Sequence, residues 1–262
     1  MKELEMNLKR ADDNLVAAIK NRVNHIEEGI LYEGDGYLIH TIGIDCLDGH
    51  LNGGICLEDS KSEEFLDKVD KFFKNLNRSY AVWVRTHDNE RLEDLLKAKG
   101  LKPARVPGST CMICNERIVG VDNPKGFTMK IVEREKEIAD MAKVVENAFG
   151  KTEEASKAIF NLPMVSNDNA KALIVYEDAT NKPVGIATTI LSGDTAGIYY
   201  VGVVDGYRGH GLGSFIAQES TNIGFDLGAK RVILQASEAG ERVYKKLSYE
   251  TISYYRSYRV EL

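Results

Sequence analysis

The sequence predicts a mixed α/β fold that is built from two similar halves. Apolar stripes with helical spacing alternate along the chain with short runs of β-branched and aromatic residues that are typical of strands. Glycine, Asn-Pro and a second glycine interrupt this pattern at 120–126 (GVDNPKG). We therefore expect a linker at 120–126 between a first domain at 1–119 and a second domain at 127–262.

The expected elements follow in chain order. Apolar residues recur at three- and four-residue steps, which predicts helices, over 15–26, 65–76 and 138–149. Short apolar runs predict strands at 37–44, 80–84, 127–132, 173–176, 184–191, 198–204, 231–234 and 252–258.

The two halves also resemble each other. Residues 78–102 read as a strand, a turn and a short amphipathic helix that ends at Gly100. Residues 229–250 repeat this layout, with Ser248 in the place of the glycine. Such self-similarity predicts two copies of one fold.

Composition limits the classes of partner. The chain has 262 residues, of which 43% are hydrophobic, and this is enough for a sizeable core. Its 34 basic and 40 acidic residues give a net charge of −6, which disfavours bulk attraction to nucleic acid or an anionic membrane. No apolar run reaches the roughly 18 residues of a membrane span, and the opening residues lack the apolar core of a signal peptide. We expect a cytoplasmic protein with no nucleic-acid or membrane partner.

Cysteine and histidine do not indicate a metal site. Cys111 and Cys114 have a spacing seen in zinc sites, with Cys46 and Cys56 as further candidates. However, the residues around the pair predict a strand, in which positions i and i+3 face opposite sides. We therefore expect buried structural cysteines and no metal. Four histidines form no cluster in the sequence and are expected at the surface or in the core: His25, His40, His50 and His87.

The most informative segment is R-G-H-G-L-G at 208–213, which lies between an apolar strand and a helix. Its three glycines lack Cβ, so backbone N–H groups can converge on an anion, and the helix N-terminus adds positive potential. Arg208 and Ser214 offer further donors to a phosphate. The segment predicts a pyrophosphate cradle; the alternative is a plain glycine-rich turn.

Two common phosphate-binding motifs do not match. A Walker loop needs Gly-Lys-Ser/Thr, and this triplet is absent from the sequence. A dinucleotide fingerprint needs a third small residue, and Ser214 and Ile216 break that match in both registers.

Two segments in this order carry a resemblance to a known family. V-x-x-x-Y-R-G-H-G-L-G resembles the acyl-CoA pyrophosphate motif Q/R-x-x-G-x-G/A of the GNAT superfamily of N-acetyltransferases. Residues 243–249 are similar to that family's L-Y-x-K-L-G-F ending. The resemblance covers roughly residues 126–262.

This resemblance implies a fold and a set of roles. Each half is expected to be a central mixed, mostly antiparallel sheet flanked by helices, and acetyl-CoA is the expected cosubstrate. Tyr244 matches the tyrosine that donates to the departing CoA thiolate. The strand at Val201 and Val203 would part from its neighbour and bind the pantetheine arm. The remaining implied contacts to the cofactor come from Arg208, Gly209, His210, Gly211, Leu212, Gly213, Ser214 and Ser237.

Two departures from the family pattern affect these roles. Ser237 stands where many members have an asparagine that contacts the cofactor. The turn before Arg208 is Asp205-Gly206, where Pro-Glu or Pro-Asp is usual.

The first half lacks these features. By the same layout its loop is expected near 51–60 (LNGGICLEDS), where Glu58 and Asp59 would repel a pyrophosphate. Leu96 stands in the place of Tyr244. We interpret 1–119 as a degenerate GNAT-like half that shapes the acceptor site or a homodimer contact; the alternative is an unrelated α/β domain.

Acetyl transfer needs a neutral amine, donors for the oxyanion and a route for the thiolate to leave. With a tyrosine pKa near 10 and a thiol pKa near 8.5, full proton transfer from Tyr244 is uphill by roughly 2 kcal/mol, so hydrogen-bond donation describes it better. Tyr244 could instead be an ordinary interface residue of an amphipathic helix. The base stays open among Asp194, Glu238, Tyr199 or Tyr200, a water chain and the carboxylate of Leu262. Three tyrosines of the final strand are expected to line the core or the acceptor cleft: Tyr254, Tyr255 and Tyr258.

The sequence therefore predicts an acetyl-CoA-dependent N-acetyltransferase that acts on the primary amine of a small molecule. The alternative is a non-catalytic acyl-CoA-binding regulatory module, because no base is evident. A nucleotide-binding protein is disfavoured by the motif mismatches above.

Overall fold

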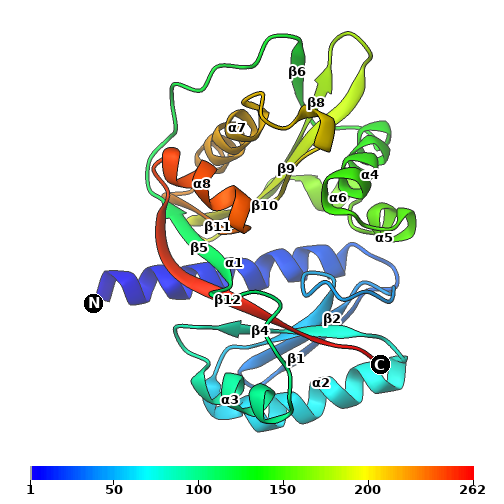
Figure 1. Cartoon of the computed structure of the whole chain (residues 1–262), viewed down its shortest axis with the longest axis vertical. Helices are drawn as coiled ribbons and strands as arrows, with labels where there is room; N and C mark the ends of the chain where they lie inside the picture. Colours follow the sequence, from blue (N-terminus) through cyan, green and yellow to red (C-terminus); the bar gives the residue numbers. More distant parts are fainter. Residues whose placement is uncertain (1) are drawn as a thin grey trace.

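The computed structural model describes residues 2–262, which form two lobes around one long mixed sheet (Figure 1). The strand order is β1-β2-β3-β4-β12-β5-β11-β10-β9-β8-β6, and β7 pairs with β8 outside this path. We call the part from β1 to β12 in this order the first lobe, and the part from β5 to β6 the second lobe.

The elements have the following bounds. Residues before the linker form α1 (Lys2–Asn24), β1 (Ile30–Gly34), β2 (Tyr37–Thr41), β3 (Asn52–Cys56), η1 (Asp59–Lys61), α2 (Ser62–Leu76), β4 (Tyr80–Arg85), α3 (Glu90–Ala98) and β5 (Ser109–Cys114). Residues after it form β6 (Phe127–Ile131), α4 (Glu135–Phe149), α5 (Glu153–Ala158), α6 (Leu162–Val165), β7 (Ser166–Asn167), β8 (Ala170–Glu177), β9 (Lys182–Ser192), β10 (Thr195–Val203), η2 (Asp205–Tyr207), α7 (Leu212–Asp226), β11 (Arg231–Ala236), α8 (Glu238–Lys246) and β12 (Glu250–Val260).

The predicted fold class is confirmed, and each of the eight strand predictions falls on an observed strand. Three strands were not predicted: β1, β3 and the two-residue strand β7. The edge strand β1 is largely exposed, and β3 contains two adjacent glycines, so neither shows the apolar β-branched pattern of a half-buried strand. No helix within residues 2–262 has the length and apolar character needed to cross a membrane.

The two lobes repeat one arrangement of strands. In the first lobe β2 and β3 are antiparallel, β3 and β4 are parallel, and α2 connects the parallel pair. In the second lobe β9 and β10 are antiparallel, β10 and β11 are parallel, and α7 connects them. This correspondence extends the similarity seen in the sequence to the whole central part of each lobe.

The lobes exchange their last strands. β5 follows α3 in the chain, yet it pairs with β11 of the second lobe. β12 follows α8, yet it pairs with β4 of the first lobe and with β5 (Figure 1). Residues 120–126 form no helix or strand, but the sheet itself is not divided there. The division into domains at 1–119 and 127–262 therefore stays a prediction. It describes the order of elements along the chain, and the pattern of a strand does not specify which strand it pairs with.

Helix α1 runs between the two lobes and is anchored in the second one (Figure 1). Asn14 is fully buried at its centre. The Asn14 Nδ2 donates to the carbonyls of Ile190 and Thr195 at 3.0 and 2.9 Å, and the Tyr199 hydroxyl donates to Asn14 Oδ1 at 2.7 Å. These hydrogen bonds tie a residue from the start of the chain to the turn between β9 and β10.

We expect Asn14→Ala to lower the free energy of unfolding by about 2 kcal/mol, because buried polar groups of the second lobe lose their partner. The shared sheet also predicts one transition for both lobes. Urea unfolding checks both points, since Trp83 is the single tryptophan and reports on the first lobe while circular dichroism reports on both.

Asn147→Ala is the matched control, because Asn147 is exposed on α4 and we expect a change within about 0.5 kcal/mol. Separate midpoints for Trp83 fluorescence and circular dichroism would show that the lobes unfold independently and would contradict the coupling.

Candidate active site

The strands β10 and β11 part at the centre of the second lobe. Their parallel pairing covers only Thr195–Gly197 of β10 and Arg231–Ile233 of β11, although the strands continue to Val203 and Ala236. A bulge in β10 lies between Tyr199 and Gly202, where Tyr200 has a φ of 52°. The backbone of β10 beyond Gly197, including Val201 and Val203, is therefore free of β11 and available to another partner.

The glycine-rich loop follows β10 directly and leads into α7. Gly209 and Gly211 have φ angles of 83° and 84°, a region that other residues rarely adopt. Gly211 is the N-cap of α7 and supplies no side-chain cap, so the first N–H groups of the helix lack a partner from a side chain. A Cβ at Gly213 would meet nothing within 4 Å. The open space before these N–H groups fits a pyrophosphate.

Arg208 is placed differently from its predicted role. Its side chain donates to the carbonyls of Val203 and Ala148 at 3.1 Å each, and it pairs with Asp205 at 2.6 Å. The guanidinium thus joins the end of β10 to the last turn of α4. Phosphate binding by Arg208 stays a prediction, and in this arrangement its backbone N–H is more available than its side chain.

A cavity of about 290 Å³ lies between the parted strands and α8. Tyr244 and Ser237 line it, together with Val201. Ser237 is the N-cap of α8, and its hydroxyl accepts from the N–H of Gly240 at 3.1 Å, which accounts for a serine at this position. Burial raises the pKa of Tyr244, so its hydroxyl remains protonated at neutral pH and can only donate its proton or a hydrogen bond.

Buried polar atoms in this cavity lack protein partners. Within residues 2–262, the hydroxyl of Tyr200 and both side-chain polar atoms of Gln235 are buried without a hydrogen bond. Buried polar groups normally have a partner, so these atoms fit a ligand or water that occupies the cavity.

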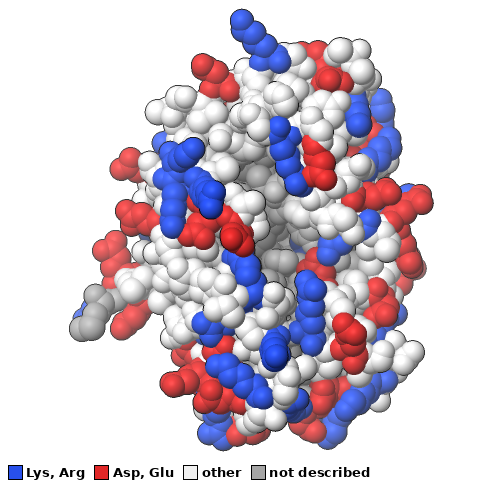
Figure 2. Space-filling view, viewed as in Figure 1, with Lys and Arg blue, Asp and Glu red and all other residues white. Residues whose placement is uncertain are grey.

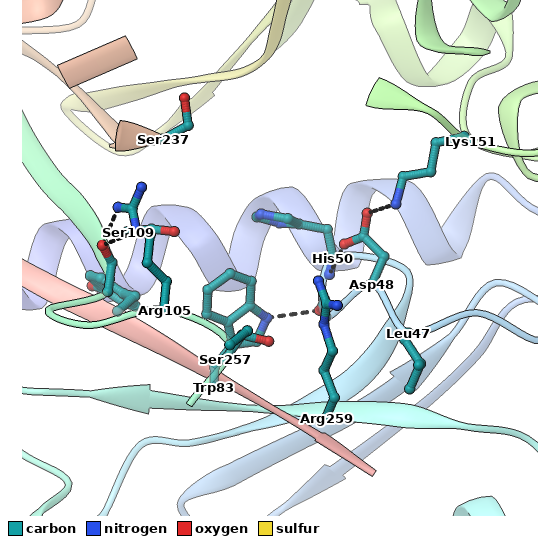
Figure 3. Close-up of a pocket in the computed structure, with 14 residues that line it drawn as sticks. Leu47, Asp48, His50, Trp83, Arg105, Ser109, Lys151, Ser237, Ser257 and Arg259 are labelled. Atoms are coloured by element: carbon teal, nitrogen blue, oxygen red, sulfur yellow. Dashed lines mark hydrogen bonds and ion pairs between the residues drawn. The ribbon is translucent and has the colours of Figure 1, made fainter. Parts of the chain in front are cut away.

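A second cavity of about 350 Å³ adjoins the first and lies against β4, β5 and β12 (Figure 3). The two cavities share Asp48, His50, Lys151 and Ser237. Figure 2 shows the corresponding hollow in the middle of this face of the molecule. We call the one between β10, β11 and α8 the strand cavity, and the second one the inter-lobe cavity.

Asp48, His50 and Lys151 meet where the cavities join. Lys151 Nζ donates to Asp48 Oδ2 at 2.5 Å, and the N–H of His50 donates to Asp48 Oδ1 at 2.9 Å. Burial alone would raise the pKa of Asp48, but His50 and Lys151 outweigh it and lower this pKa to about 2. Burial lowers the pKa of His50 to about 4, against the opposing effect of Asp48. At neutral pH the carboxylate is ionised and the imidazole is neutral.

His50, for which a surface or core role was expected, lies at the junction of the two cavities. Its ring packs against Trp83, with 4.9 Å between centroids, and lines both cavities. Asp48 and Lys151 were also missed. These residues come from the loop before β3 and the loop after α4, so no spacing in the sequence links them.

Most candidates for the base lie elsewhere. Asp194 pairs with Arg231 at 2.7 Å in the turn before β10, and neither Glu238 nor Leu262 lines either cavity. Tyr199 and Tyr200 do line the strand cavity, but burial raises the pKa of both, which disfavours them as bases at neutral pH. His210 is exposed in the glycine loop.

The corresponding loop of the first lobe is closed. The N–H groups of Leu57 and Glu58 donate to the carbonyl of Gly36 at 2.7 and 3.0 Å. The Asp59 carboxylate accepts from the N–H groups of Arg91 and Leu92 at the start of α3, at 2.9 and 3.1 Å. The N–H groups of Leu57 and Glu58 in this loop are thus used by the protein itself, and Asp59 fixes the loop to the start of α3.

Other predicted residues are structural. Cys111 and Cys114 are both buried and belong to different core clusters, as expected for opposite faces of β5. In β12, Tyr255 donates to Asp12 and lines the inter-lobe cavity, Tyr258 is buried and donates to Glu93 at 2.6 Å, and Tyr254 is half-buried. Leu96 is buried in the core of the first lobe.

Comparisons with known proteins agree with this geometry. Residues 136–249 match the model of the acetyltransferase (GNAT) family. No curated protein sequence matches the chain. A GCN5-related N-acetyltransferase from Kribbella flavida is similar in structure, with a TM-score of 0.72 and 17% identity over 96% of this chain and 94% of that one.

Two further solved structures show the same fold. One is a GCN5-related N-acetyltransferase from Sphaerobacter thermophilus, with a TM-score of 0.63 and 15% identity over 96% of this chain and 91% of that one. The other is described as a tandem GNAT protein from the clavulanic acid biosynthesis pathway, with a TM-score of 0.62 and 12% identity over 99% of this chain and 94% of that one.

The open space at Gly213 leads to a prediction about folding and binding. We expect Gly213→Ala to leave the free energy of unfolding equal or to raise it by about 0.5–1 kcal/mol, because alanine suits a helix better than glycine, and to keep the affinity for acetyl-CoA, because the motif admits alanine at this position. We expect Gly213→Glu to weaken acetyl-CoA binding at least about tenfold, because its carboxylate would repel a pyrophosphate at these N–H groups. Thermal unfolding and calorimetric titration measure the two effects.

Gly206→Ala is the control, since a Cβ there also meets nothing within 4 Å and its φ is not in the left-handed region. Unchanged acetyl-CoA affinity in Gly213→Glu would show that the anion lies elsewhere.

Proposed function

Because residues 136–249 are a domain of the acetyltransferase (GNAT) family, we propose that the protein is an acetyl-CoA-dependent N-acetyltransferase that acts on a primary amine of a small molecule. The observation that carries this proposal is the parting of β10 and β11, which leaves a cavity of about 290 Å³ beside β10, while the loop after β10 leads to a helix N-terminus whose N-cap, Gly211, offers no side chain.

The cofactor would extend along β10. Its pyrophosphate would face the N–H groups from Gly209 to Ser214, and its pantetheine arm would take the free backbone groups of Val201 and Val203. The acetyl thioester then lies in the strand cavity, close to Tyr244. The hydroxyl of Ser237 caps α8, and the residue lines both cavities.

The reaction forms one C–N bond and breaks one C–S bond. A neutral amine attacks the thioester carbon, and backbone N–H groups of parted β10 are placed to stabilise the oxyanion. The C–S bond then breaks, and Tyr244 donates a hydrogen bond to the sulfur as negative charge develops there.

We assign His50 as the group that accepts the proton of the amine as the C–N bond forms, when the nitrogen becomes more acidic. It lies where the two cavities meet, and burial lowers its pKa to about 4, which keeps the imidazole neutral at pH 7 and also weakens it as a base toward a free ammonium. Asp48 stabilises the imidazolium that forms, through its ionised carboxylate.

The shape of the inter-lobe cavity supports a small acceptor. Its volume of about 350 Å³ is at the lower end of the range for small-molecule sites. Walls come from β4, through Trp83, and from β12, through Ser257 and Arg259. The degenerate first lobe therefore contributes to acceptor binding rather than to cofactor binding.

Thiol release from acetyl-CoA over a panel of small amines tests the activity, with Tyr244→Phe as the first variant. We expect kcat to fall by about 10²-fold, in the range of a lost proton donor, with little change in the Kd of acetyl-CoA. Equal turnover in Tyr244→Phe would remove Tyr244 from the mechanism. Tight acetyl-CoA binding with no turnover of any amine would instead indicate a non-catalytic binding module.

His50→Gln tests the base. We expect kcat to fall by about 10²-fold, while the affinity for acetyl-CoA is retained, because the imidazole acts on the acceptor and not on the cofactor. His25→Gln is the matched control, since His25 is exposed on the chain after α1. If amines of low pKa, which are neutral without a base, lose as much activity as those of high pKa, His50 is not the proton acceptor.

A further inference from the structure

The inter-lobe cavity has an excess of positive charge. Three cationic side chains line it, Arg105, Lys151 and Arg259, against one carboxylate among its described residues, Asp48. Asp48 is already paired with Lys151. This local excess runs against the net charge of −6 of the whole chain.

The two arginines differ in how they are held. Arg105 is fixed by the protein, since its guanidinium donates to the carbonyl of Gly108 through Nε at 2.8 Å and through Nη2, and to that of Ala236 at 3.3 Å. No carboxylate among residues 2–262 pairs with Arg105 or Arg259, although both line the cavity. Figure 3 shows the Arg259 side chain rising from β12 toward the loop that carries Asp48 and His50.

The phosphates of the cofactor do not account for these charges. Residues 205–214 line neither cavity, whereas Arg105 and Arg259 belong to the inter-lobe cavity on the far side of Ser237. Two guanidiniums that form no ion pair within residues 2–262 therefore line the space that the acceptor would occupy. Arg259 can bind a carboxylate or phosphate through paired hydrogen bonds, whereas Nε and Nη2 of Arg105 already donate to carbonyls, which leaves its Nη1 to contribute.

We propose that the acceptor is a primary amine that carries an anionic group, a carboxylate or a phosphate, bound by the cationic side chains of the inter-lobe cavity, with Arg259 as its main partner. Arg259 is directed toward the loop of Asp48 and His50, so the anionic group and the amine that faces His50 would lie close together, whereas Arg105 lies on the other side of Trp83 (Figure 3). Trp83 provides an apolar wall of the cavity, because its indole N–H is occupied by the carbonyl of Gly49 at 2.8 Å. This inference rests on the proposed acetyl transfer for the role of the amine, but not for the binding of the anion.

Matched pairs of amines test the proposal by turnover and by binding. The pairs are α-amino acids with their amides, 6-aminohexanoate with 6-aminohexanol, and O-phosphoethanolamine with ethanolamine. We expect the anionic member of at least one pair to have a KM about 10- to 100-fold lower. The carboxylate and phosphate pairs show which anion is preferred. Calorimetric titration into the CoA-bound protein gives the Kd of the same compounds without turnover.

Arg259→Gln is the decisive variant, because Arg259 is exposed and its loss leaves no buried partner behind. We expect it to remove the advantage in KM of the anionic member over the neutral member of each pair. Arg105→Gln should act in the same direction, and its thermal unfolding shows whether the loop is retained. Arg242→Gln, an exposed arginine of α8 that lines neither cavity, is the control.

The outcomes separate the two proposals. Turnover without preference for the anionic members, or an Arg259→Gln protein with the same preference, would overturn the anion site and leave the acetyltransferase intact. Anion-selective binding that Arg259→Gln abolishes, with no turnover of any amine, would support the anion site and overturn the catalytic proposal.

Discussion

The position of β12 between β4 and β5 is the constraint on which the rest of the structure depends. Through this strand the two lobes form one sheet, and their relative orientation follows from backbone hydrogen bonds rather than from a flexible linker. The inter-lobe cavity lies against β4, β5 and β12, so the walls that these strands form are held by the hydrogen bonds of the sheet. An acceptor site placed there gains preorganisation without a closing lid.

The two lobes repeat one arrangement of strands but differ at their parallel pairs. In the second lobe β10 and β11 part and leave a cavity, whereas the pairing of β3 with β4 reaches Ile55, next to the end of the strand. Gly53 and Gly54 are needed there for packing, because a Cβ would lie 2.3 Å from the carbonyl oxygen of Ala81 or 2.6 Å from the Phe65 ring. The second lobe therefore has a cavity between its parted strands, whereas the first lobe contributes residues that line the inter-lobe cavity.

Local patterns in the sequence predicted the parts of this molecule that are local. The strand, loop and helix from 198 to 227 and the helix that carries Tyr244 depend on residues close together in the chain, and they were predicted in place. The exchange of β5 and β12 between the lobes could not be predicted, because the residues of a strand do not specify whether it pairs with β4 or with β11. The position of His50 at the junction of the cavities was missed for the same reason, since its neighbours Trp83, Asp48 and Lys151 lie in separate segments. The side-chain contacts of Arg208 with Val203, Ala148 and Asp205 could not be read from its motif either.

The carboxylate of Asp59 gives the first lobe a permanent internal ligand. It satisfies N–H groups at the start of α3 from the loop that corresponds to the glycine loop. The start of α2, which corresponds to the start of α7, also lacks a side-chain cap, so Asp59 fixes its loop to α3 and does not replace an anion there. Acetyl-CoA bound as proposed would, by linkage, stabilise the second lobe directly and the first lobe only through the shared sheet. Cellular acetyl-CoA would then protect the whole chain from proteolysis.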